Sequence, residues 1–170
     1  MRIFAVDPGT TESGWCLFDS LGKVEDSGVA CNHDVLRWIK AGGSGSDVLA
    51  IEMIAGMGMT VGQTTFETVR WIGRMQQTWR EPESVRLVLR REVKSEICGD
   101  QRAKDANIRQ ALIDRLGEPG IKRRPGPTYG VAGDAWAALA VAVTAWHELH
   151  SLATAPVPMR QAQIENLAGA

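Results

Sequence analysis

Short apolar runs that end in turn-forming residues predict a set of strands in the first third of the chain. Residues 2–7 are almost wholly apolar and are closed by Pro8 and Gly9, which indicates a buried strand that ends in a turn. Residues 14–19 follow at hairpin distance, and residues 23–30 are placed to form the third strand of an antiparallel meander. Residues 48–53 form a second apolar run and predict another buried strand.

Helical spacing of apolar residues begins after this meander. We expect a short helix over residues 35–41 capped by Asp34, and a longer one that starts at Thr64 or Thr65 and ends near Trp79. Two further helices are expected, over residues 105–116 and 134–149. The second of these is rich in alanine and almost wholly apolar, so it should be buried.

Two segments between these helices complete the prediction. Residues 85–93 alternate apolar and polar positions and predict a fifth strand, whereas residues 118–133 are rich in Gly, Pro and basic residues and predict a loop. The order of elements predicts one α/β domain over residues 1–153, with a five-stranded mixed sheet that combines the meander with parallel strands and carries helices on its faces. Residues 154–170 contain proline and small polar residues and predict a flexible C-terminal tail.

The helix that ends near Trp79 has an unusually wide apolar face. Its apolar positions cover an arc of roughly 160° at ~100° per residue. Either two neighbours within the chain enclose the helix, or the helix packs on its own sheet and also on a second subunit. The positions are Val69, Trp71, Ile72, Met75 and Trp79.

Composition places the chain among ordinary globular proteins. It has 170 residues, of which 44% are hydrophobic and 23% are charged. Residues 1–6 run directly into a strand without a cleavage pattern, so we expect no signal peptide. The longest apolar run, residues 135–143, is shorter than the roughly 20 residues that a membrane span needs. The three cysteines are scattered, which favours reduced thiols in the cytoplasm over a disulfide framework or a zinc site.

Charge is distributed unevenly, although the net charge is only −1. Residues 86–124 carry a net +5, while residues 1–85 carry −4 and residues 125–170 carry −2. A basic block beside an acidic remainder is expected where one face meets phosphate and another gathers carboxylates; a merely solvated basic surface gives the same pattern. The candidate phosphate-contacting residues from this pattern are Arg90, Arg91, Arg102, Lys122, Arg123 and Arg124.

Two carboxylates stand at the ends of apolar strands. Alternation places Asp7 on the same strand face as Ile3 and Ala5, and it places Glu52 on the same face as Val48 and Ala50. A carboxylate at the end of a buried strand is costly unless it is paired, hydrogen-bonded or bound to a cation. If the two strands are neighbours, Asp7 and Glu52 form an oxygen-rich site for Mg²⁺. The alternative is that each carboxylate only caps a turn.

A third carboxylate, Asp134, opens the alanine-rich helix. It is either an ordinary helix N-cap or a third ligand, because small side chains let a helix lie close to a sheet and bring its first residue to the strand ends. Three carboxylates from two strands and a helix can hold two Mg²⁺ ions ~3.5–4 Å apart, the arrangement used for phosphodiester hydrolysis. One ion would activate the attacking water and the other would stabilise the leaving oxygen.

Four motifs, in order, resemble those of the RuvC-type Holliday junction resolvases. They cover most of residues 1–147, and four matches in the family order are far more specific than any one alone. The motifs are Val-Asp-Pro-Gly-Thr at 6–10 with Ser-Gly-Trp at 13–15, Ala-Ile-Glu-Met at 50–53, Glu-Val-Lys at 92–94 followed by Gly99 and Ala-Lys at 103–104, and the Asp-Ala-Trp-Ala-Ala-Leu-Ala helix that starts at 134.

The resemblance implies an RNase H-like fold and a homodimeric endodeoxyribonuclease that nicks four-way DNA junctions in recombination and repair, with Mg²⁺ as cofactor and Mn²⁺ as a substitute. It implies that Asp7, Glu52 and Asp134 are the catalytic, metal-binding carboxylates. Lys94 and Lys104 match the family's basic, DNA-contacting positions.

The chain departs from the family pattern at Ala137. The family usually has a second carboxylate there, one helical turn after the first, so either three carboxylates suffice or another residue such as Asp105 contributes. Residues 55–63, with Met57 and Met59, follow Glu52 directly; this loop either wedges into the junction centre or is simply packed or mobile.

Other functions stay open at this point. An RNase H-like nuclease for flaps, forks or RNA–DNA hybrids and a non-catalytic junction-binding relative are the nearest alternatives, and the change at Ala137 makes the second conceivable. The Asp-Pro-Gly-Thr-Thr sequence at 7–11 also resembles the first phosphate loop of sugar kinases and Hsp70-type ATPases. Those proteins hold nucleotide between two such domains, and this chain has room for one.

Overall fold

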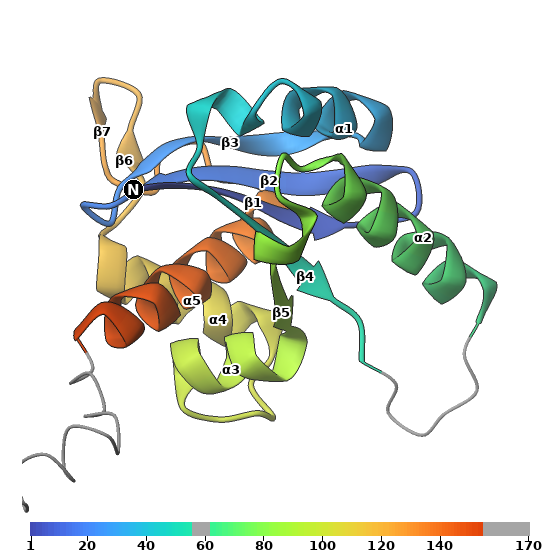
Figure 1. Cartoon of the computed structure of the whole chain (residues 1–170). Coiled ribbons are helices and arrows are strands. Elements are labelled where there is room, and N and C mark those ends of the chain that lie inside the picture. The colour runs from blue at the N-terminus through green and yellow to red at the C-terminus, as the bar shows by residue number, and fades with distance from the viewer. Residues whose placement is uncertain (56–61, 155–170) are drawn as a thin grey trace, which may run out of the picture.

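A five-stranded sheet with helices on both faces forms the centre of the protein (Figure 1). The computed structural model describes residues 1–55 and 62–154. The strands are β1 (Arg2–Pro8), β2 (Glu12–Asp19), β3 (Val24–Cys31), β4 (Val48–Met53) and β5 (Arg86–Leu89). They are ordered β3-β2-β1-β4-β5, with β1, β2 and β3 antiparallel in turn and β4 and β5 parallel to β1. The predicted mixed sheet with its antiparallel meander is confirmed.

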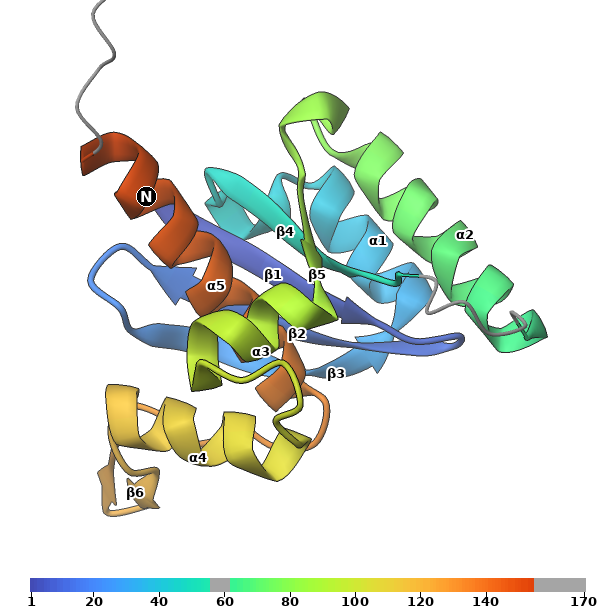
Figure 2. The same ribbon diagram turned by 90° about the horizontal axis from the view of Figure 1, so that it is seen from below.

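The helices form two layers of different size (Figures 1 and 2). On one face lie α1 (Asn32–Lys40) and α2 (Gln63–Thr78); on the other lie α3 (Arg90–Cys98), α4 (Asp105–Leu116) and α5 (Ala135–Thr154). Short 3₁₀ turns, Gly43–Gly45 and Pro82–Ser84, precede β4 and β5, and a two-stranded hairpin of β6 (Gly120–Ile121) and β7 (Arg124–Pro125) follows α4. None of the helices in the described ranges is both long and apolar enough to span a membrane.

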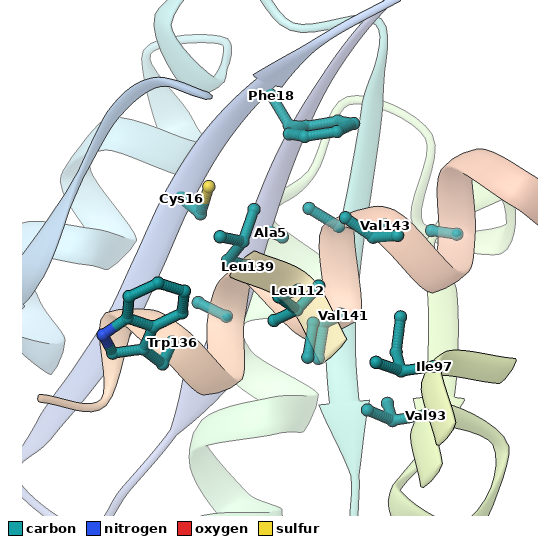
Figure 3. Packing of buried hydrophobic residues seen from close by; sticks show 14 of the residues in the cluster. Ala5, Cys16, Phe18, Val93, Ile97, Leu112, Trp136, Leu139, Val141 and Val143 are labelled. Atoms are coloured by element: carbon teal, nitrogen blue, oxygen red, sulfur yellow. The ribbon is translucent and has the colours of Figure 1, made fainter. Parts of the chain in front are cut away.

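Helix α5 is the central element of the larger layer. It lies across the strands with small and branched side chains facing the sheet, as Figure 3 shows. Leu139 and Val143 of α5 pack with Ala5 and Phe18 of the strands in one buried cluster. Alternate residues of the same strands, such as Phe4, point to the other face and pack with α1 and α2. The predicted burial of the alanine-rich helix is confirmed, and the helix continues beyond the predicted residue 149.

The prediction of a strand over residues 85–93 was wrong in its second half. The strand ends at Leu89, and α3 begins at Arg90 because the Glu92 carboxylate accepts a hydrogen bond from the Leu89 backbone N–H at 2.8 Å. This bond caps the first turn of the helix. Val93 and Ile97, four residues apart, then turn the same way into the core, so the apolar positions follow the period of a helix.

Three smaller boundaries also differ from the sequence prediction. Helix α1 begins at Asn32, whose buried side chain accepts a hydrogen bond from the Ser13 hydroxyl and donates one to the Gly9 carbonyl, so Asp34 lies inside the first turn instead of capping it. Helix α2 begins at Gln63, ahead of the expected threonine caps. The loop predicted over 118–133 contains the small β6–β7 hairpin.

Candidate metal and nucleic-acid site

The three carboxylates that the sequence singled out line one cavity of about 340 Å³. Asp7 lies near the end of β1, Glu52 near the end of β4, and Asp134 directly before α5. The other residues that line this cavity are Arg90, Asp105, Ile108, Arg109, Gly133, Trp136 and Ala137. Segments far apart in the sequence therefore bring four acidic side chains, Asp105 included, to one place.

The register of the parallel strands brings Asp7 beside Glu52. The last paired residues of β1 and β4 are Val6 and Ile51, and each acidic residue follows its paired residue directly. Both strands are buried, so the apolar alternation that forms the core also fixes the side on which the carboxylates emerge. The sequence left open whether the two strands are neighbours, and this pairing shows that they are.

Asp134 reaches the strand ends because β2 carries a glycine opposite Asp7. A Cβ atom on Gly14 would lie 2.6 Å from the carbonyl carbon of Asp134, a distance that real Cβ atoms do not show. Glycine at this position therefore lets the start of α5 lie against the sheet. The motif resemblance included Gly14, but sequence reasoning gave it no role.

The backbone carbonyl of Asp134 accepts the first hydrogen bonds of α5, whereas its carboxylate takes no part in starting the helix. Its carbonyl accepts hydrogen bonds from the N–H groups of Ala137 and Ala138. Within the described part of the chain its carboxylate is exposed and makes no hydrogen bond. A side-chain N-cap is therefore not the role of this residue here, which leaves its oxygens free to meet a ligand in the cavity.

Arg90 supplies a positive charge inside the cavity. Its Nη1 donates a hydrogen bond to Glu52 at 3.1 Å, and its Nη2 pairs with Asp105. The sequence grouped Arg90 with the phosphate-contacting residues; in the structure its guanidinium lies among the carboxylates. The side chain of Glu52 is only 14% exposed, whereas that of Asp105 is 83% exposed. Arg90 thus connects a nearly buried acid to one in solvent.

Burial and mutual repulsion make the cavity unfavourable for negative charge. Burial, and then the negative charge of Glu52, raise the pKa of Asp7 from 3.8 to about 7. Burial also raises the pKa of Glu52, although the Arg90 guanidinium opposes this effect. Burial lowers the pKa of Arg90, but Glu52 and Asp105 outweigh it, so the net shift is upward. Such a site gains from any cation that enters it.

The donor chemistry fits a hard divalent cation, although the ligand set is not closed in this conformation. Within residues 1–55 and 62–154, no three acidic, histidine or cysteine side chains stand close enough together to hold a metal ion. The carboxylates that share the cavity are all oxygen donors, the kind that Mg²⁺ and Mn²⁺ accept. Two of these acids, Glu52 and Asp105, are at present held by Arg90.

Basic residues from the predicted set lie along α3, α4 and the hairpin beyond. Lys94 is half-buried on α3, and its charge lowers the pKa of Glu52, so it lies near the cavity. Lys104, directly before α4, is exposed, as are Arg91 and Arg102. The hairpin residues 122–124 are also exposed and follow the far end of α4, whose 12 residues make it about 18 Å long. The basic block is therefore spread over one layer of the protein.

Among the residues that the structure describes, helix α2 buries only part of its wide apolar face. Of the predicted positions, Ile72, Met75 and Trp79 are buried against the sheet and α1, whereas Val69 is 37% exposed. Phe66, which was not among the predicted positions, is 65% exposed. Trp71 is half-buried, and its indole N–H donates to the Thr10 carbonyl. Most of the loop that carries Met57 and Met59 lies outside the described residues.

The fold is similar to that of solved RuvC structures. The protein superposes on the structure of RuvC from Thermus thermophilus with a TM-score of 0.66 and 16% identity over 89% of this chain and 97% of that chain. A second structure, of the T. thermophilus protein in complex with a Holliday junction substrate, matches with a TM-score of 0.66 and 17% identity over 89% and 96%. No protein-family model matches the chain, and no curated protein sequence matches it significantly. The predicted RNase H-like fold is confirmed.

Proposed function

We propose that this protein is a metal-dependent, structure-specific endodeoxyribonuclease that cuts four-way DNA junctions. The observation that carries the proposal is the meeting of Asp7, Glu52 and Asp134 in one cavity of a RuvC-type fold. The similar T. thermophilus protein has been solved with a Holliday junction substrate, which supports branched DNA as the substrate class.

In this proposal the three carboxylates hold Mg²⁺ or Mn²⁺, and the basic residues of α3, α4 and the β6–β7 hairpin bind the DNA. When bound, divalent ions supply an activated water and stabilise the leaving oxygen. Asp7 suits this role, because a bound cation offsets the burial and the repulsion by Glu52 that raise its pKa. Lys94, whose charge lowers the pKa of Glu52, and Lys104, at the start of α4, bind phosphates that flank the cut.

We further propose that the active form is a homodimer, because a four-way junction presents two symmetric cutting positions. The residues that the structure describes leave Phe66 on α2 65% exposed, which marks a surface available to a second subunit. Light scattering of the purified protein tests this: a mass near 37 kDa, twice the 18.5 kDa of the chain, is expected, and a monomer at all concentrations contradicts it.

Cleavage of matched substrates tests the substrate class. With Mg²⁺ or Mn²⁺, we expect symmetric nicks in a four-way junction and much slower cutting of flaps, forks, RNA–DNA hybrids and linear duplex. Faster cutting of a flap, a fork or a hybrid would favour the related nuclease functions. Tight junction binding without cutting by any divalent ion would favour a non-catalytic relative, for which the absence of a carboxylate at Ala137 is the specific observation.

A further inference from the structure

Arg90 is bound to two acids through different nitrogen atoms. Nη1 contacts the nearly buried Glu52, and Nη2 contacts the exposed Asp105. The two bonds therefore have different strengths in water. An ion pair with a nearly buried carboxylate is weakly screened, while one with an exposed carboxylate contributes little. Either bond can break without breaking the other.

The other arginine that lines the cavity does not take the same position. The Arg109 guanidinium stacks over the ring of Trp136, 5.0 Å from its centroid. Arg90 is thus the cation in the cavity that the structure pairs with the acids. Glu52 in particular needs a partner, because an ionised carboxylate with so little contact with water is costly when it stands alone.

We propose that Arg90 is an exchangeable internal cation, which neutralises Glu52 in the metal-free protein and gives up that bond to a phosphate of the DNA when metal is bound. This inference rests on the proposed metal site. Asp105 is the anchor of the exchange: once a metal ion has taken over the charge of Glu52, the weaker pair between Asp105 and Nη2 remains and keeps the guanidinium at the mouth of the cavity while Nη1 is released. The released Nη1 is then a donor for a phosphate oxygen, the kind of acceptor that guanidinium groups bind well.

The proposal requires Arg90 and metal to compete for Glu52. Calorimetric titration of the DNA-free protein with Ca²⁺, a probe that occupies oxygen sites, measures this competition. Arg90→Gln should lower the half-saturating Ca²⁺ concentration about tenfold, whereas Arg91→Gln, which removes a neighbouring exposed charge of α3, should leave it nearly unchanged. Equal or weaker Ca²⁺ binding by Arg90→Gln would overturn the proposal, because Arg90 would then support the site instead of competing for it.

A double-mutant cycle separates an anchor from a metal ligand. If Asp105 acts only through Arg90, Asp105→Asn has no effect on Ca²⁺ affinity once Arg90→Gln is present. If Asp105 itself binds metal, the substitution weakens Ca²⁺ binding severalfold in that background as well, and its assignment as the anchor is wrong.

Junction binding tests whether the released Arg90 binds a DNA phosphate. Arg90→Gln should weaken binding to a four-way junction about tenfold in Ca²⁺ and only slightly in EDTA, where Arg90 is engaged by the acids. Arg91→Gln should have the same effect in both. Equal loss in Ca²⁺ and EDTA for Arg90→Gln would overturn the exchange. If the unmodified protein does not bind Ca²⁺ at all, the proposed metal site itself fails, and that result is distinct from binding that is insensitive to Arg90.

Discussion

Replacement of Asp7 by asparagine should abolish cleavage and at the same time stabilise the metal-free protein at alkaline pH. The pKa of Asp7 is raised from 3.8 to about 7, first by burial and then by the charge of Glu52. Because the pKa of Asp7 is higher in the folded protein than in the unfolded one, the protonated carboxyl stabilises the fold. This stabilisation is complete below the unfolded-state pKa and is lost as the pH rises through about 7. At higher pH the folded protein therefore carries an unfavourable charge that Asp7→Asn removes.

The size of the effect follows from the pKa difference. At ~1.4 kcal/mol per pH unit, a rise from 3.8 to about 7 corresponds to about 4 kcal/mol of stability lost between acid and alkaline pH. Asp7 is half-buried, so solvent screening reduces this value, and we expect Asp7→Asn to gain about 2–4 kcal/mol near pH 8. For a chain of this length that is a rise in Tm of roughly 5–10 °C.

Thermal unfolding in EDTA across the pH range measures this gain. The stabilisation should shrink towards pH ~4, where Asp7 is protonated in the folded protein. Asp114→Asn, which removes an exposed carboxylate of α4, is the matched control and should change stability by less than about 0.5 kcal/mol. Adding Mg²⁺ should raise the Tm of the unmodified protein far more than that of Asp7→Asn. Loss of stability in Asp7→Asn near pH 8 would mean that Asp7 is a structural turn cap, and the electrostatic reasoning would be wrong.

Three further predictions follow from the site. Gly14→Ala should displace Asp134 from the strand ends and abolish cleavage, at a cost of about 1–3 kcal/mol in unfolding free energy; full activity would show that this close approach is dispensable. Lys104→Gln should weaken junction binding and reduce the slope of log K against log salt by about 1, and an unchanged slope would place the DNA elsewhere. Ala137→Asp should tighten Ca²⁺ binding and lower the metal-free Tm, since it adds a carboxylate to the same cavity; weaker binding would show that the added group points away.

The strands could be predicted from the sequence because both faces of the sheet are buried, which requires apolar residues along the strands. Apolar residues in β1 and β4 face the core on alternate sides, so the positions of Asp7 and Glu52 at the strand ends could be predicted before the structure was known. The α/β order of elements predicted parallel strands, but it left open whether β1 and β4 are neighbours. The buried α5 was predictable for the same reason, through its almost continuous apolar sequence.

Sequence reasoning failed where one side chain changed the local structure. Residues 85–93 alternate like a strand, but the bond from the Leu89 N–H to Glu92 starts a helix at Arg90. This local change sets the place of Arg90, whose partner Glu52 lies 38 residues earlier. A contact over that distance has no local signal, so Arg90 was assigned to the basic surface.

The role of Gly14 was also hidden in the sequence. It sits in an ordinary strand conformation, and only the approach of the Asp134 backbone shows why a side chain is excluded. The prediction of Asp105 as a possible contributor was closer, because it named a residue that does line the cavity. Its pairing with Arg90 requires the tertiary fold. The homodimer and a cytoplasmic location stay predictions.

The central claim is that Asp7, Glu52 and Asp134 bind divalent ions together. A crystal structure of the protein soaked in Mn²⁺, with anomalous scattering to locate the ions, tests it most directly. We expect Mn²⁺ in the cavity with oxygens of all three side chains as ligands, and Nη1 of Arg90 withdrawn from Glu52. Saturating Mn²⁺ that binds elsewhere, or a cavity in which Arg90 still holds Glu52 and no ion is present, would contradict the account.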